Sequence, residues 1–87
     1  MPDFEWDEGN EDKLLLRHNV SASEAEQCFA NLNTRRRVGD DLLILGKTDG
    51  GRMLFMVYEQ KSGGLVRVYS AREMNGREQK LYRRSAK

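Results

Sequence analysis

Glycine-containing turns divide the second half of the chain into short segments. Gly39-Asp40, Thr48-Asp49-Gly50-Gly51 and Lys61-Ser62-Gly63-Gly64 carry the residues that tight turns favour. Parallel strands need a crossover of about a dozen or more residues, and these connections are far shorter. The pattern therefore predicts an antiparallel meander of about four strands, at residues 35–38, 42–47, 52–60 and 65–70.

The third of these segments is apolar on both of its faces. Side chains alternate along a strand, so Met53 and Phe55 point to one side while Leu54 and Met56 point to the other. A strand with two apolar faces is typical of a central position that is covered above and below.

Two helices are predicted before the sheet. Asp7 is a favourable N-cap and Asn19 a favourable left-handed stop, which gives a helix from Asp7 to His18. Ser21 and Glu24 form a capping box for a second helix. The apolar stripe of this helix comprises Ala25, Cys28, Phe29 and Leu32. The stripe predicts that Cys28 is a small buried residue rather than a reactive thiol.

The last segment, residues 71–87, contains the pattern of a further helix start, Asn75-Gly76-Arg77-Glu78. The order of two helices, a strand meander and one helix predicts an α+β fold with an antiparallel sheet. A chain of 87 residues can build one core but not two, so residues 1–87 are expected to form a single domain.

Several classes of protein are excluded by what the composition lacks. The single cysteine, Cys28, and the single histidine, His18, preclude an internal disulfide and a Cys- or His-based metal site. No apolar run approaches the roughly 20 residues that span a bilayer, and the first residues lack the pattern of a signal peptide. We expect a cytoplasmic domain with no cofactor, no metal and no membrane contact.

The net charge of +1 conceals an uneven distribution of charge. Residues 1–31 carry eight acidic and two basic side chains, whereas residues 66–87 carry seven basic and two acidic ones. An anionic partner is therefore expected at the C-terminal third of the chain. The cationic and aromatic residues of that third are Arg67, Tyr69, Arg72, Arg77, Lys80, Tyr82, Arg83 and Arg84.

These residues have the chemistry that RNA binding and cleavage require. Guanidinium and ammonium groups bind phosphate, and tyrosine rings stack on unpaired bases. In RNA cleavage the 2′-hydroxyl is the nucleophile, so a base, an acid and cations that hold the developing charge suffice without a metal ion. A basic last helix is equally compatible with a solvent-exposed surface that binds no partner.

Two other features each allow two interpretations. His18 closes the first predicted helix, where an imidazolium interacts favourably with the helix dipole, and it is also a candidate acid or base. Arg35-Arg36-Arg37 can bind phosphate or can protect a sheet edge from aggregation. We favour edge protection or partner contact for the three arginines.

A set of short motifs runs from Phe4 to Arg84. The motifs are Phe4-Glu5-Trp6-Asp7, Arg17-His18-Asn19-Val20-Ser21, Ala25-Glu26, Gly46-Lys47-Thr48-Asp49-Gly50-Gly51-Arg52, Val57-Tyr58, residues 66–74, Arg77-Glu78 and Leu81-Tyr82. In this order and at these spacings the chain resembles the BrnT-type toxins, the ribonuclease half of BrnT/BrnA toxin–antitoxin pairs. The resemblance implies an α+β fold similar to that of RelE-type ribonucleases, and metal-independent RNA cleavage that inhibits translation. It also implies neutralisation by a ribbon-helix-helix antitoxin, with DNA bound only indirectly through that antitoxin.

The resemblance, taken with the basic C-terminal third, suggests functional positions. Arg72 and Arg77 are expected to hold the phosphate and the transition state, and His18 or Lys80 to act as acid or base. Further contacts to RNA are expected from Lys47, Arg52, Arg67, Tyr69, Tyr82 and Arg84.

Departures from the family pattern motivate a second hypothesis. Asn19 stands where the family usually has glycine, and Glu59-Gln60-Lys61 replaces a Thr-Glu-Arg stretch. A diverged member can lose catalysis and keep binding, so the alternative is a catalytically inactive RNA- or protein-binding module on the same scaffold.

Overall fold

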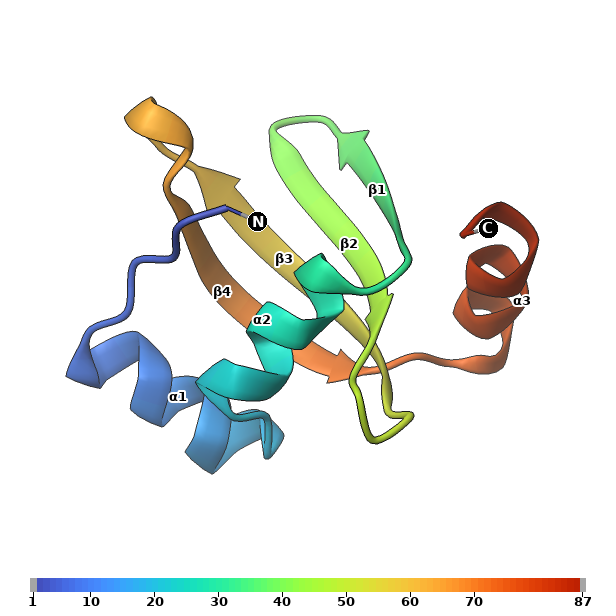
Figure 1. Ribbon diagram of the computed structural model, residues 1–87, viewed down its shortest axis with the longest axis horizontal. Helices are drawn as coiled ribbons and strands as arrows, with labels where there is room; N and C mark the ends of the chain where they lie inside the picture. Colours follow the sequence, from blue (N-terminus) through green and yellow to red (C-terminus); the bar gives the residue numbers. More distant parts are fainter. Residues whose placement is uncertain (1, 87) are drawn as a thin grey trace.

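A four-stranded antiparallel sheet forms the middle layer of the protein (Figure 1). The computed structural model describes residues 2–86. The strands are β1 (Asn33–Val38), β2 (Asp41–Lys47), β3 (Met53–Gln60) and β4 (Val66–Glu73). They pair in the order β1-β2-β3-β4, so the predicted meander is confirmed and β3 is a central strand.

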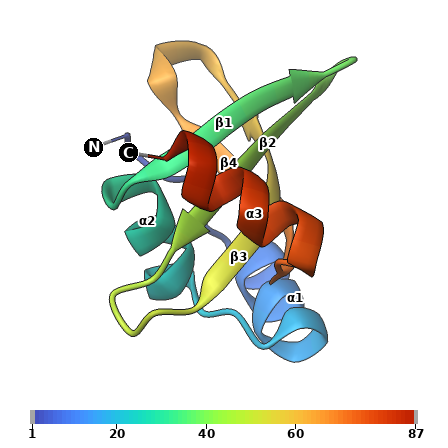
Figure 2. The same ribbon diagram turned by 90° about the vertical axis from the view of Figure 1, so that its right-hand side faces the viewer.

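Helices cover both faces of the sheet (Figures 1 and 2). Two of them, α1 (Glu8–His18) and α2 (Ala22–Ala30), lie on one face, and α3 (Gly76–Ser85) crosses β1 and β2 on the other. A 3-10 turn, η1 (Ser62–Gly64), joins β3 to β4. The predicted α+β class, with two helices before the sheet and one after it, is confirmed.

Polar caps fix where each helix begins. Asp7, Ser21 and Asn75 each accept a hydrogen bond from the third amide of their helix, and each takes part in a capping box. At the end of α1, Asn19 has a φ of 55°, the left-handed conformation expected of a stop residue. The caps thus set the helix boundaries that orient His18 and Arg77.

The main core lies between the sheet and the helix pair α1 and α2. Leu14, Ile44, Leu54 and Met56 are fully buried in it. Cys28 is also fully buried, as predicted, and burial raises the pKa of its thiol to about 12. A smaller cluster beneath α3 is formed by Leu45, Met74 and Tyr82.

The structure corrects two details of the sequence interpretation. Leu32 is 62% exposed rather than part of the buried stripe, because α2 ends at Ala30 and the chain then turns into β1. The last strand continues past Ser70 to Glu73, and a register shift opposite Val57 and Tyr58 changes which side chains face each layer. As a consequence Arg72 lies on β4 itself, next to Phe55 on β3.

Candidate functional site

The end of the sheet where β4 leads into α3 presents Arg72 in a fixed position. Its guanidinium donates two hydrogen bonds of 2.8 Å to the Glu78 carboxylate and one of 3.2 Å to the Glu73 carbonyl. It also lies 4.3 Å from the centre of the Phe55 ring. A guanidinium has five N–H groups, so about two remain free to bind an anion. Arg72 is therefore held in place while part of its donor capacity faces solvent.

The outward face of α3 is basic. Arg77, Lys80, Arg83 and Arg84 are exposed, and none of them forms an ion pair with any other residue in the range 2–86. Glu78 is turned the other way, toward Arg72. The fold thus separates the charges of α3, with Glu78 paired to Arg72 and four cations along the outward face of the helix.

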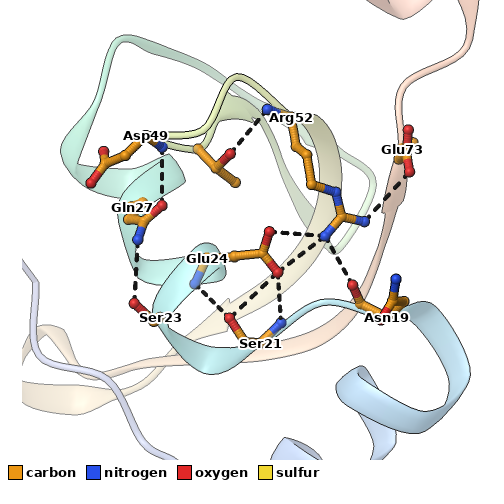
Figure 3. A network of polar contacts seen from close by, with 9 residues as sticks. Asn19, Ser21, Ser23, Glu24, Gln27, Asp49, Arg52 and Glu73 are labelled. Atoms are coloured by element: carbon orange, nitrogen blue, oxygen red, sulfur yellow. Dashed lines mark hydrogen bonds and ion pairs between the residues drawn. The ribbon is translucent and has the colours of Figure 1, made fainter.

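His18 lies at the same end of the sheet, on the α1 side. Arg52 bridges the two segments (Figure 3). It donates at 2.9 Å to the carbonyl of Asn19, the residue after His18, and its guanidinium lies 3.5 Å from the carboxylate of Glu73, the residue after Arg72. Arg72 itself points to the opposite face of the sheet, toward Phe55. The predicted catalytic residues are thus divided, with His18 on the α1 side and Arg72, Arg77 and Lys80 on the α3 side.

Arg52 joins three segments of the chain rather than standing free for RNA. Its guanidinium bonds both Glu24 carboxylate oxygens, at 3.0 and 2.9 Å, and so ties β3 to α2 and to the end of α1 (Figure 3). Burial alone would raise the pKa of Glu24, but the Ser21 amide and the Arg52 guanidinium outweigh it and hold that pKa below its usual value. The Arg52 contacts therefore stabilise the fold at this end of the sheet.

These contacts predict a loss of stability in acid. A carboxylate whose folded pKa lies below its unfolded value stabilises the fold above the unfolded pKa, and this contribution disappears as the pH falls through the folded pKa. Glu24, Glu78 and Glu5 all have lowered pKa values relative to 4.5. We expect urea unfolding midpoints that are flat from about pH 7 to 5 and fall below about pH 4.5.

Glu24→Gln is the matched variant for this prediction. This variant should be less stable than the wild type at pH 7. It should also lose less stability than the wild type on acidification, because one of the carboxylates responsible for the pH dependence is gone. A midpoint that stays constant or rises between pH 5 and pH 3 would contradict the role given to these ion pairs.

The other predicted RNA-binding residues differ in how accessible they are. Lys47 is exposed at the end of β2, and Tyr69 is 41% exposed with its hydroxyl donating to Glu59. Arg67 donates to Glu5 at 3.0 Å and to Asp7 at 2.9 Å, which attaches the N-terminal segment to β4. Tyr82 is 8% exposed and donates its hydroxyl to the Leu32 carbonyl, so its ring is packed beneath α3 and cannot reach a base in this conformation.

A cavity at the opposite end of the sheet has the wrong charge for RNA. It measures about 430 Å³ and is lined by Arg37, Asp40, Asp41 and Glu59, among others. Three carboxylates to one guanidinium would repel a phosphate. No group of three or more His, Cys, Asp or Glu side chains among residues 2–86 is arranged to hold a metal ion. The cavity is therefore a poorer candidate for anion binding than the Arg72 end of the sheet.

Sequence reasoning did not identify the residues that position Arg72. Glu78 was recognised only as part of a helix cap, and Phe55 only as a core residue. The positions of Arg72 and Glu78 on either side of a helix start could have suggested their ion pair. Placing Phe55 beside Arg72 requires the register between β3 and β4, which the sequence alone does not give.

The fold and this site define a small α+β protein with a cationic surface suited to an anionic polymer. Residues 6–78 match the model of a family described as "Ribonuclease toxin, BrnT, of type II toxin-antitoxin system". The match covers most of the chain, so the protein belongs to the BrnT family of ribonuclease toxins. Membership implies an RNA substrate and an antitoxin partner.

A search of curated proteins finds none that matches this chain. Within residues 2–86, the helices are too short or too polar to cross a bilayer.

Proposed function

We propose that the protein cleaves RNA without a metal ion at the end of the sheet where β4 meets α3. The observation that carries the proposal is Arg72, which Glu78 and Phe55 hold in place while about two of its N–H groups stay free. Arg77 is exposed in the first turn of α3, next in the chain to Glu78, the ion-pair partner of Arg72. Two guanidinium groups near one point can bind a phosphate and stabilise the charge that develops on it.

The proposed reaction needs no metal ion. A base removes the proton of the 2′-hydroxyl, whose oxygen attacks the adjacent phosphorus. The bond to the 5′-oxygen of the next nucleotide breaks, and an acid protonates that oxygen. The products are a 2′,3′-cyclic phosphate and a 5′-hydroxyl. Lys80 lies on the α3 side with Arg72 and is the proposed acid or base, and solvent water is the second proton-transfer group. His18 lies on the α1 side, so we assign it no proton transfer at this site.

The remaining contacts to RNA are assigned by accessibility. Lys47 and Arg84 are exposed and suited to phosphate, and Tyr69 offers a partly exposed ring. Arg52, Arg67 and Tyr82 are bound to other parts of the chain, so we assign them positioning roles.

In the cell, we propose that cleavage inhibits translation in the cytoplasm and that a ribbon-helix-helix antitoxin neutralises it. The family match supports a toxin with an antitoxin. A ribbon-helix-helix partner would also bring DNA to the complex, because the strands of that fold bind the major groove.

Induced expression in a bacterial host tests this cellular role. We expect growth arrest and an early fall in amino-acid incorporation, both reversed when the protein encoded beside this gene is expressed at the same time. Arg72→Ala expressed to the same level is the control and should leave growth unaffected. Normal growth and protein synthesis on induction of the wild type would contradict the proposal.

A further inference from the structure

The outer edge of β1 is available to another chain. β1 is the first strand in the sheet order and pairs only with β2. In an edge strand, alternate residues direct their N–H and C=O groups away from the sheet. No backbone hydrogen bond outside the β1–β2 ladder involves residues 33–38 among the described residues. The outer edge of β1, six residues long, therefore has backbone N–H and C=O groups free to pair with another strand.

The side chains along this edge are typical of a protein interface. Leu32 and Val38 at its two ends are 62% and 59% exposed, and they are among the five large apolar residues found exposed in residues 2–86. Three exposed arginines lie between them. Apolar anchors and arginine are enriched in protein–protein contacts, whereas RNA phosphate would make no use of the apolar pair.

The arginines lie on both faces of the edge. Arg35 is held against the α2 side, since its guanidinium is 5.1 Å from the centre of the Phe29 ring. Arg36 borders a small apolar cleft of about 150 Å³ on the α3 side, together with Leu43 and Leu81. A fifth strand would have neighbouring side chains on alternating faces, and each face would offer it a cation.

We propose that an extended acidic segment of the antitoxin adds to β1 as a fifth strand. Its backbone would complete the open ladder, its carboxylates would pair with Arg35 and Arg36, and apolar side chains about 20 Å apart would cover Leu32 and Val38. The same arginines would repel β1 of a second copy and so disfavour self-association through this edge. The inference rests on membership of a toxin–antitoxin family but not on RNA cleavage by this chain.

Amide hydrogen exchange of the purified toxin, alone and with its cognate antitoxin, tests the docking edge. We expect exchange of the β1 amides to slow at least tenfold in the complex. Protection confined to α1, where Leu15 and Leu16 are exposed, would overturn the proposal. Protection of β1 by an RNA oligonucleotide but not by the antitoxin would also overturn it.

A pair of charge reversals gives an independent measurement by calorimetry at 0.15 M salt. R35E/R36E should raise the dissociation constant of the antitoxin at least tenfold. K13E/R17E, which makes the same change of charge on exposed residues of α1, should alter it less than threefold. The reverse ranking would contradict docking on β1. Neither measurement contains RNA, so a failure of RNA cleavage would leave both results interpretable.

Discussion

Arg72→Ala should lower the rate of RNA cleavage about 10²–10³-fold. A charged donor aimed at a developing oxyanion contributes at this level, because it is already oriented when the transition state forms. Arg72 is oriented by the Glu78 carboxylate and the Phe55 ring. The affinity for uncleaved RNA should fall far less, since other cations on the outward face of α3 remain. Single-turnover cleavage and equilibrium binding, measured on the same RNA, separate the two effects.

Glu78→Gln is the control that separates catalysis from stability. The Arg72–Glu78 pair raises the pKa of Arg72 and lowers that of Glu78, so both variants lose the same ion pair. The melting temperature should therefore fall by a similar amount in the two variants. Cleavage should fall much less in Glu78→Gln than in Arg72→Ala, because Glu78→Gln keeps the guanidinium and its contact with Phe55 and loses only part of its orientation. Equal losses of cleavage in the two variants would show that Arg72 acts only through the fold.

The second large effect is expected at Gly46. A Cβ placed there would lie 2.6 Å from the Cβ of Cys28 and 2.8 Å from its carbonyl oxygen, so β2 and α2 touch with no space for a side chain. The carbonyl belongs to the backbone of α2 and cannot rotate away. We expect Gly46→Ala to reduce the free energy of unfolding by about 3 kcal/mol, at the upper end of the usual cost of overpacking.

Gly50→Ala provides the matched control for Gly46. The nearest atom to a Cβ at Gly50 is the Thr48 hydroxyl oxygen at 3.9 Å, and Gly50 is not among the glycines with a positive φ. Gly50→Ala should change the free energy of unfolding by no more than about 0.5 kcal/mol. Urea denaturation measures both variants. Equal stability of the two would show that α2 can move away from the sheet at no cost.

Local chemistry made most of the fold predictable. Asp7, Ser21 and Asn75 satisfy helix amides within their own three-residue neighbourhood, and the turns at Gly39 and Gly50 exclude parallel connections. These interactions depend on residues close in the chain. Leu32 was misplaced because its helical spacing continued beyond the point where the backbone left α2.

The candidate site was less predictable, because its charges are paired across long separations in the chain. Arg67 meets Asp7 and Arg52 meets Glu24, and neither pairing leaves a trace in spacing or composition. The C-terminal third contains the exposed cations of α3, but two of its arginines, Arg67 and Arg72, carry carboxylate partners. The acidic N-terminal part supplies the partners of Arg67, so the charge asymmetry of the sequence is partly neutralised on folding.

One measurement tests the central claim most directly. The purified protein is incubated with a single-stranded RNA in excess EDTA, and the termini of the products are identified. We predict cleavage at the same rate with and without added Mg²⁺, with 2′,3′-cyclic phosphate and 5′-hydroxyl ends. RNA that stays intact until a divalent metal is added, or products that carry 5′-phosphates, would contradict metal-independent cleavage at the Arg72 end of the sheet.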